Sequence, residues 1–289
     1  MESVAEPLIS VLQLGTLDYA TGLRLQEKLV TLRKEGAIGD VLLLLEHPPV
    51  ITLGRNAQSK NILASPELLA QRGVEVFECD RGGDITFHGL GQLVGYPIFD
   101  LRGFPSASAT RKTLGVVEYV RLLEEVLIRT CGDFRIPTKR IPGLTGVWTD
   151  HAYLLSRAEQ NHSLENASAG SGDLLSPDSK IAALGVHISR GVTSHGIALN
   201  VNTDLSFFKL IVPCGIASKP VTSMARELAR TVPMEDVAPS LSRNFGLVFR
   251  SQILWLDSLD ALLGRNLGVP MKVPENLRRI HGEDDPALV

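Results

Sequence analysis

The sequence predicts an α/β (α+β) fold, because helical and strand patterns alternate along the chain. Several segments space their apolar residues at helical intervals, and others alternate apolar with polar residues as strands do. The chain has 289 residues, of which 44% are hydrophobic, and this is ample for a packed core.

The first predicted helix carries leucines on one face. Leu25, Leu29 and Leu32 recur at helical spacing, and Gly36 follows them as a stop signal. The next segment, residues 41–45, is a short run of valine and leucines. We expect this run to form a buried strand.

A second, shorter helix is predicted to begin at Ser65. The Ser65 hydroxyl suits an N-cap, and Pro66 suits the first helical position. Gly73 ends this helix, and residues 74–79 then read as a strand that leads into a glycine-rich segment. Another strand follows at residues 93–98.

A longer amphipathic helix is expected next. Val116, Val120, Leu123 and Leu127 share one helical face, and the pattern stops near Gly132. This helix separates the strands of the N-terminal half from those that follow.

Three further strands are expected at residues 146–154, 181–189 and 195–202. The last one alternates cleanly, with Ile197, Leu199 and Val201 on one face and Ala198, Asn200 and Asn202 on the other. Helical segments follow near residues 235–249 and 258–263. We expect Pro239 to bend or restart the first of them.

Composition excludes several classes of protein. The formal net charge of -3 lacks the basic excess of a nucleic-acid binder. No apolar run approaches the roughly 18 residues of a membrane span. Cys79, Cys131 and Cys214 form no CxxC pair and no even disulfide set. The first residues resemble neither a signal peptide nor a transit peptide. We therefore expect a cytoplasmic protein with no nucleic-acid or membrane partner and, since the Cys and His residues lack ligand spacing, no metal site.

The segment from residue 81 to residue 92 is dense in glycine, which indicates close backbone approach or positive φ. A lone Gly-Gly is explained as well by a tight turn into the following strand. In combination with the downstream motifs we favour a ligand wall. The residues that form it are Arg81, Gly82, Gly83, Asp84, Ile85, Thr86, Phe87 and His88.

Lys180 and Cys214 indicate acyl-transfer chemistry when they are taken together. A thiol attacks as its thiolate, and a neighbouring ammonium lowers the thiol pKa from about 8.5 towards neutrality. Alone, a cysteine is more often a small buried apolar residue and a lysine is usually a solvated charge.

The downstream sequence makes the pairing specific. The blocks at residues 185–205 and 207–216 read GVHISRGVTSHGIALNVNTDL and FFKLIVPCGI, and shorter matches lie at residues 46–47, 52–55 and 220–224. Together they closely resemble the octanoyltransferases, the lipoyl(octanoyl) transferase family, over roughly residues 8 to 250.

The resemblance implies a mixed β-sheet flanked by helices, similar to the catalytic domains of biotin and lipoate protein ligases. We expect residues 1–289 to form a single catalytic domain, with its core at about 8–250 and a C-terminal extension at about 250–289. Residues 156–179 depart from the family, which makes this connection as a tight turn. The segment is polar and unpatterned, so we expect a mobile loop inserted in a hairpin.

The implied reaction moves an octanoyl group from octanoyl-acyl carrier protein to a lysine of a lipoyl domain. The acceptors would be the lipoyl domains of 2-oxoacid dehydrogenases and the glycine cleavage H protein. Cys214 would form an octanoyl thioester, and Lys180 would stabilise the thiolate and later take the proton of the acceptor amine. A thioester is already activated, so no cofactor is needed, and the chain has no GxxxxGK[ST] phosphate loop.

The acyl tunnel would be lined by the glycine segment and by two later strands. The strand residues are Ala183, Leu184, Gly185, Gly196, Ile197 and Ala198. Their backbone N–H groups would also face the oxyanion. His88 and His195 remain open: each either serves the site or only hydrogen-bonds its loop.

Two other functions remain as alternatives. An ATP-dependent lipoate-protein ligase shares the fold and a lysine but needs no cysteine nucleophile. A non-catalytic acyl-binding module would keep the tunnel without the Lys-Cys pair. Since acyl carrier proteins are acidic, we also expect a basic rim near the tunnel mouth, with Lys139, Arg140 and Lys209 as candidates.

Overall fold

The chain folds around an eight-stranded mixed sheet with the order β11-β1-β2-β6-β10-β9-β8-β7. The computed structural model describes residues 7–107, 110–153, 178–213 and 219–262. The strands of this large sheet are β1 (Leu8–Thr16), β2 (Asp40–Glu46), β6 (Gln92–Ile98), β7 (Thr138–Ile141), β8 (Leu144–Thr149), β9 (Lys180–Ser189), β10 (Val192–Asn200) and β11 (Gln252–Trp255).

Strand direction changes across the sheet. β11, β1 and β2 run parallel, whereas β2, β6, β10, β9, β8 and β7 pair antiparallel in that order. β9 and β10 lie side by side in the register Leu199↔Ala182, Ala198↔Ala183 and His195↔Val186. The expected hairpin of β8 and β9 is confirmed by their antiparallel pairing. Most of the predicted inserted loop between them, residues 156–177 of 156–179, lies outside the described residues.

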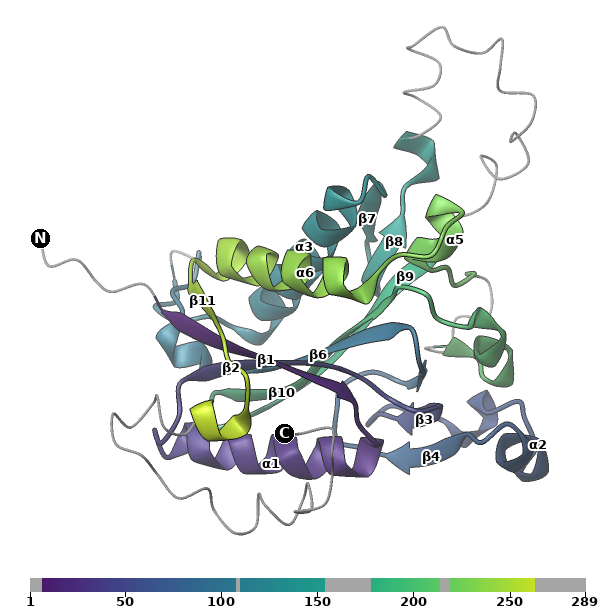
Figure 1. The fold of residues 1–289 in the computed structure, drawn as a ribbon, viewed down its shortest axis with the longest axis horizontal. Coiled ribbons are helices and arrows are strands. Elements are labelled where there is room, and N and C mark those ends of the chain that lie inside the picture. Colours follow the sequence, from purple (N-terminus) through teal and green to yellow (C-terminus); the bar gives the residue numbers. More distant parts are fainter. Residues whose placement is uncertain (1–6, 108–109, 154–177, 214–218, 263–289) are drawn as a thin grey trace, which may run out of the picture.

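A second, three-stranded sheet lies against one end of the first (Figure 1). It has the order β4-β3-β5, with strands β3 (Val50–Leu53), β4 (Glu75–Glu78) and β5 (Ile85–His88). The short helix α2 (Pro66–Gln71) and the 3-10 segments Ser59–Asn61 and Leu205–Leu210 accompany it. Ile51, Ile85, Phe87 and Leu210 form its own small core.

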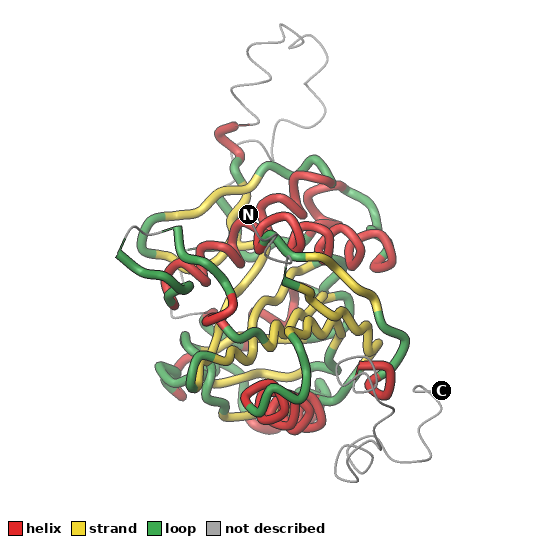
Figure 2. Tube along the Cα trace, turned by 90° about the vertical axis from the view of Figure 1, so that its left-hand side faces the viewer, coloured by secondary structure: helices red, strands yellow, loops and turns green. Residues whose placement is uncertain are grey.

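Helices cover both faces of the large sheet, as Figures 1 and 2 show. Helix α1 (Tyr19–Lys34) buries Leu25 and Leu29 against one face. Helices α3 (Val116–Asp133) and α6 (Met234–Phe249) pack together on the other face. The short helix α5 (Met224–Leu228) lies before α6. The predicted mixed sheet flanked by helices is therefore confirmed.

Local signals explain the first two helices. The Asp18 side chain caps α1 by accepting a hydrogen bond from the Thr21 N–H at 2.9 Å, and Gly36 has a φ of +72° just beyond its end. The Ser65 hydroxyl accepts from the Leu68 N–H at 3.3 Å, as predicted for α2. Both helices thus begin where their capping residues place them.

Three predictions about single elements were wrong in whole or in part. The helix predicted near residues 235–249 is confirmed as α6, but it does not restart at Pro239: it continues through this residue, because the proline removes only one donor while Val237, Leu241 and Phe245 gain buried contacts. Strand β8 ends at Thr149 rather than at residue 154. There the Asp150 carboxylate accepts from the Tyr153 N–H at 3.3 Å and supports a helical turn at residues 151–153.

The third concerns the buried face of α3. Val116 is exposed, whereas Tyr119 lies in the core beside Leu123 and Leu127. The helix therefore presents a face shifted slightly from the predicted one.

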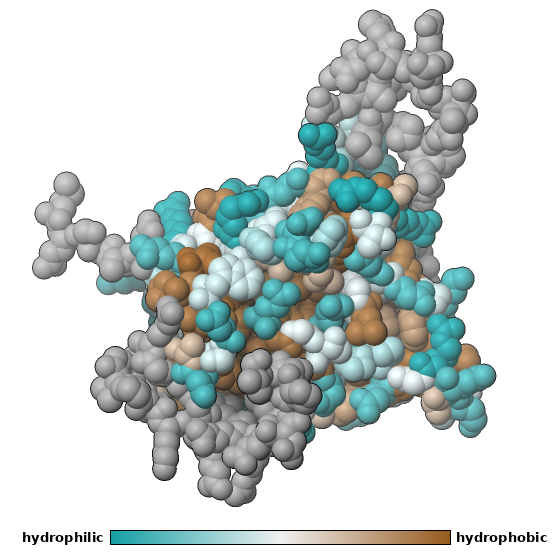
Figure 3. Space-filling model, viewed as in Figure 1, coloured by the Kyte–Doolittle hydropathy of each residue, from teal (hydrophilic) through white to brown (hydrophobic). Residues whose placement is uncertain are grey.

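The molecular surface is mixed in polarity on the face shown in Figure 3. Exposed apolar side chains include Leu8, Leu247 and Trp255, around the edge strand β11. Within the described parts of the chain, the helices are all too short or too polar to cross a membrane.

Candidate active site

A narrow cavity of about 40 Å³ lies between the large sheet and the glycine-rich segment that leads into β5. Its walls come from the start of α1, the glycine segment, β6, β9 and β10. The lining residues are Tyr19, Arg81, Gly83, Asp84, Thr86, His88, Tyr96, Ala183, Leu184, Gly185, His195, Gly196, Ile197 and Ala198. Most of the predicted binding residues therefore lie around one cavity.

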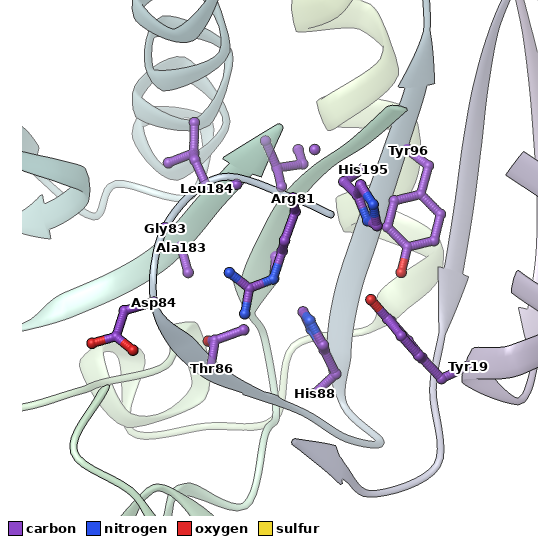
Figure 4. A pocket seen from close by; sticks show the side chains of 14 residues that line it. Tyr19, Arg81, Gly83, Asp84, Thr86, His88, Tyr96, Ala183, Leu184 and His195 are labelled. Atoms are coloured by element: carbon purple, nitrogen blue, oxygen red, sulfur yellow. The ribbon is translucent and has the colours of Figure 1, made fainter. Parts of the chain in front are cut away.

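Arg81 occupies the middle of this cavity (Figure 4). The residue is only 7% exposed, and its guanidinium donates to the Thr52 carbonyl at 2.6 Å, to the Thr52 hydroxyl and to the Gly82 carbonyl. Its hydrogen bonds within the described chain thus go to neutral oxygens. A buried cation with neutral acceptors gives the cavity a positive potential.

Glycines allow the chain to close around Arg81. A Cβ atom at Gly54 would lie 2.6 Å from Arg81 Nη1, and one at Gly185 would lie 3.1 Å from Arg81 Cδ. Gly83 has a φ of +86°. The close approach predicted from glycine density is therefore present, and at Gly54 and Gly185 the backbone lies against the Arg81 side chain.

Three predicted wall residues have other surroundings. Ile85 and Phe87 alternate with Thr86 and His88 along β5, so their side chains enter the core of the small sheet. Gly82 packs against β9, and its N–H donates to the Val186 carbonyl at 2.9 Å.

Asp84 lies at the rim of the cavity. Its carboxylate accepts from Asn61 Nδ2 at 2.7 Å, and Figure 4 shows it turned away from the cavity centre. It therefore ties the glycine segment to the 3-10 turn at Asn61.

Three of the predicted oxyanion donors are already paired. The Gly82 N–H is used by Val186, and Ile197 and Ala198 pair with β6 on one side and β9 on the other. Backbone groups between two paired strands are consumed by the ladder. The N–H groups of these three residues are therefore taken, and the oxyanion role of the other predicted donors stays a prediction.

His88 is held as a neutral imidazole. Gln92 Nε2 donates to the Phe87 carbonyl and to Asn200 Oδ1, so Gln92 Oε1 accepts from His88 Nδ1–H at 2.7 Å. Burial lowers the pKa of His88 to about 3. His88 thus both lines the cavity and fixes β5 to β6.

Tyr19 and Tyr96 are cavity residues that the sequence did not reveal. His47 donates Nδ1–H to the Leu17 carbonyl at 2.5 Å and accepts from the Tyr96 hydroxyl at 2.7 Å. Burial lowers the pKa of His47 to about 4 and raises the pKa of both tyrosines. The sequence signal that could have pointed to them is the motif Glu46-His47, because the His47 ring packs against both tyrosine rings.

His195 stands at the same side of the cavity as the two tyrosines (Figure 4). Its φ of +54° is unusual for a residue other than glycine. The backbone N–H donates to Gln26 Oε1 at 2.7 Å, and Nε2 lies 2.8 Å from Asp80 Oδ1. Asp80 and Gln26 therefore fix both the backbone and the ring of His195.

Lys180 begins β9, and its side chain is held in a cradle formed by β8. The ammonium lies 5.0 Å from the centroid of the Trp148 ring, and the residue is 7% exposed. A Cβ atom at Gly146 would come within 2.8 Å of Lys180 Cε and 3.3 Å of Lys180 Nζ. Only glycine at position 146 leaves room for this path.

Cys214 lies outside the described residues, which stop at Pro213 and resume at Lys219. The chain on the far side of this gap is adjacent to Lys180, since the Lys180 N–H donates to the Pro220 carbonyl at 2.8 Å and the Thr222 N–H donates to the Lys180 carbonyl. The Lys180-Cys214 pairing stays a prediction.

The other two cysteines have different environments. Cys131 is buried in the core, and burial raises its pKa to about 12. Cys79 is partly buried, and its thiol donates to the Leu53 carbonyl at 3.4 Å. Among the described residues, no group of three or more His, Cys, Asp or Glu side chains is arranged to hold a metal ion.

Two candidates for the basic rim are neutralised. Lys139 pairs with Asp150 at 3.0 Å and with Asp178 at 2.9 Å. Arg140 pairs with Glu124 at 3.1 Å and with Glu125 at 2.9 Å. Lys209 is exposed on the 3-10 segment after β10. The basic rim stays a prediction, and Lys139 and Arg140 are the candidates already held in ion pairs.

Comparison with known proteins gives consistent results. Residues 18–246 match the family described as the lipoyl protein ligase A/B catalytic domain. An octanoyltransferase from Koribacter versatilis is 57% identical over 277 residues, which are 96% of this chain and 98% of the relative. An octanoyltransferase from Acidobacterium capsulatum is 54% identical over 258 residues, 89% of this chain and 96% of the relative.

Solved structures resemble the chain in fold. A putative lipoate protein ligase from T. acidophilum with bound lipoic acid aligns with a TM-score of 0.62 at 11% identity, covering 96% of this chain and 98% of that one. A lipoate-protein ligase A bound with ATP aligns with a TM-score of 0.62 at 12% identity, covering 89% and 93%. At these identities the likeness establishes a shared fold, and the predicted lipoate-ligase fold is confirmed.

Proposed function

The chain belongs to the lipoyl protein ligase A/B catalytic domain family, and we propose that it is an octanoyltransferase that acts in protein lipoylation. The observation that carries the proposal is the layout of β9. This strand begins at Lys180 and continues directly into Ala183, Leu184 and Gly185 on the cavity wall. The lysine and the cavity wall thus follow one another along a single strand.

The dimensions of β9 suit an acyl chain. A Cβ atom at Gly146 would lie 3.0 Å from the Ala182 carbonyl oxygen and 3.3 Å from Lys180 Nζ, so the Lys180 ammonium lies beside Ala182. From Ala183 to Val186, the residue opposite His195, β9 extends roughly 10 Å. An octanoyl chain has seven C–C bonds of about 1.5 Å each, so it extends no further than about 10 Å. A thioester held near Lys180 would therefore place the hydrocarbon tail against the cavity wall.

The proposed reaction has two transfers. The Cys214 thiolate attacks the carbonyl of octanoyl-acyl carrier protein, an octanoyl-enzyme thioester forms, and the carrier thiol leaves. The amine of the acceptor lysine then attacks this thioester, an amide forms, and the Cys214 thiolate leaves. The exchange of one thioester for another is nearly isoenergetic and the amide is more stable, so the sequence of steps needs no nucleotide.

Lys180 serves both transfers in this proposal. Its ammonium stabilises the Cys214 thiolate before acylation, and in its neutral form it takes the proton of the incoming amine. The cradle of Gly146 and Trp148 supports this role, because it fixes where the side chain ends. A positioned general base contributes typically 10²- to 10⁴-fold to such a step.

The donor and acceptor follow from the reaction. We propose octanoyl-acyl carrier protein as donor, and the lipoyl domains of 2-oxoacid dehydrogenases and the glycine cleavage H protein as acceptors. An acidic carrier would meet Lys60, Lys209 and Lys219, which form no ion pair with any described residue. The Asn61 carbonyl accepts from the Val212 N–H at 2.7 Å, so Lys60 lies beside the chain that leads to Cys214.

Charge reversal tests this docking site. Lys209→Glu should slow association with the carrier and reduce its dependence on salt. Lys139→Glu is the matched control, since Lys139 is already held by two aspartates. Equal effects of the two substitutions on association would contradict the proposed docking site.

The central experiment is incubation with octanoyl-carrier protein in the absence of nucleotide, followed by intact mass measurement. We expect an octanoyl adduct on the parent protein and none on Cys214→Ser, whose hydroxyl is a far weaker nucleophile. An absolute requirement for ATP would instead indicate a ligase. Absence of any adduct under either condition would favour an acyl-binding module.

A second measurement separates the roles of the two residues. In Lys180→Met the ammonium is gone, so alkylation of Cys214 by iodoacetamide should shift to higher pH, towards the free thiol pKa of about 8.5. Transfer to the acceptor lysine should fall further than acylation does. If Cys214 titrates identically with and without Lys180, the two residues do not form a dyad.

A further inference from the structure

We propose that His195 is the end wall of the acyl cavity and sets the longest acyl chain that the enzyme accepts. The inference rests on the proposed function, because it assigns the cavity to an acyl tail. It goes beyond that function in naming the residue that limits chain length. Two cavities that share His195 carry the argument.

The second cavity lies on the other side of His195, between α1 and the ends of β4, β9 and β10. It measures about 580 Å³, against about 40 Å³ for the acyl cavity, and its lining includes Gln26, Lys34, Asp80 and Ser194 as well as His195. His195 thus stands between a tight cavity and a roomy one.

The sheet register fixes which end of the acyl cavity His195 closes. Along β9 the chain passes from Lys180 to Ala183 and then to Val186, which lies opposite His195 on β10. Figure 4 shows the same order, with Ala183 and Leu184 on one side of the cavity and His195 on the other. A tail that enters from Lys180 therefore meets His195 last.

The wall is held rigidly. The ring of His195 crosses the Tyr96 ring at 89° with centroids 6.3 Å apart, and Nε2 lies 2.8 Å from the Asp80 carboxylate. The backbone is anchored by Gln26 Oε1. A ring held by two contacts on an anchored backbone cannot swing aside for a longer tail without losing these contacts.

The positive φ of His195 provides a mild way to remove the wall. Glycine adopts such a φ without strain, so His195→Gly deletes the ring and keeps the backbone path. Asp80→Ala is a second variant, which frees the ring without touching the core, because the Asp80 side chain is 61% exposed. Ser194→Ala is the control, a neighbour in the chain that lines only the larger of the two cavities.

The test compares acyl-enzyme formation from octanoyl- and dodecanoyl-carrier protein for each variant. Each additional C–C bond lengthens the tail by at most about 1.5 Å, so four more carbons extend it by up to about 6 Å. We expect His195→Gly to raise the ratio of the dodecanoyl to the octanoyl rate by about tenfold or more, the scale on which a pocket discriminates single methylenes. Asp80→Ala should raise it less, and Ser194→Ala should keep the parental ratio.

Because the dodecanoyl and octanoyl rates are compared within one variant, any effect of the substitution on folding or on the fraction of active enzyme cancels in their ratio. If His195→Gly and Asp80→Ala both keep the parental ratio while the octanoyl-enzyme still forms, the assignment of His195 is wrong and the proposed function stands. If the parent protein forms no acyl-enzyme from either donor, the proposed function fails, and this inference fails with it.

Discussion

Gly146→Ala should displace the proposed catalytic lysine at a moderate cost in stability. The new Cβ would lie 2.8 Å from Lys180 Cε and 3.0 Å from the Ala182 carbonyl oxygen. Ordinary contact begins at 3.4 Å, so Cε must retreat by at least 3.4 − 2.8 = 0.6 Å. The end of a lysine side chain moves readily, and we therefore expect the ammonium to leave its place over Trp148.

The two consequences differ in magnitude. Gly146 has a φ of +134°, and the backbone strain of an alanine there lowers the free energy of unfolding by on the order of 1–3 kcal/mol. Misplacement of a catalytic group by about 1 Å can cost on the order of 100-fold in rate. We expect octanoyl transfer to fall by roughly 10- to 100-fold, and iodoacetamide alkylation of Cys214 to require higher pH.

Gly143→Ala is the matched control. Gly143 lies in the same β7–β8 hairpin with a φ of +79°, and a Cβ there would meet nothing within 4 Å. It should show comparable backbone strain in a urea unfolding experiment, with normal transfer and a normal pH profile for Cys214. Equal loss of transfer in the two variants would refute the cradle, because backbone strain alone would then explain both.

Three further outcomes are expected. Burial lowers the pKa of His47 to about 4 and of His88 to about 3, so the unfolded chain binds more protons below its own histidine pKa of about 6.5. The contribution of these two histidines to the free energy of unfolding is complete above that pH and is lost on acidification, by about 2 kcal/mol per histidine at pH 5. A free energy of unfolding in urea that does not change between pH 7 and pH 5 would contradict this expectation. Glu124→Ala should lower the free energy of unfolding by about 3–5 kcal/mol, because Glu124 is fully buried and pairs with two arginines and the N–H of a glycine. Glu125→Ala, at a partly exposed site, should lower it by less than about 1 kcal/mol. Similar unfolding free energies for the two variants would argue against this difference. Removal of residues 157–176 with a short turn should leave transfer within about tenfold, a barrier change below roughly 1.4 kcal/mol, and a thousandfold loss in a folded variant would exclude a dispensable loop.

The sequence by itself determined the elements whose signals are local. The leucine spacing of α1, the cap at Ser65 and the alternation of β10 each depend on residues a few positions apart, and the structure confirms all three. The glycine-rich segment could also be recognised from the sequence, since dense glycine indicates that the backbone closely approaches some other group. The sequence did not show which group this is, and the structure shows that it includes the Arg81 side chain of the same segment.

Contacts between distant residues needed the tertiary structure. Tyr19 and Tyr96 meet at the cavity only because Tyr19 begins α1 and Tyr96 projects from β6 toward the face of the sheet that α1 covers. Lys139 and Arg140 resemble free surface charges in the sequence, yet their carboxylate partners arrive from other elements. Strand β11 went unpredicted because four residues carry little periodic signal, and its parallel pairing with β1 supplies the stabilisation. Periodicity and capping are fixed over one or two turns of chain, whereas register, burial and charge pairing are fixed by the packing of the whole core.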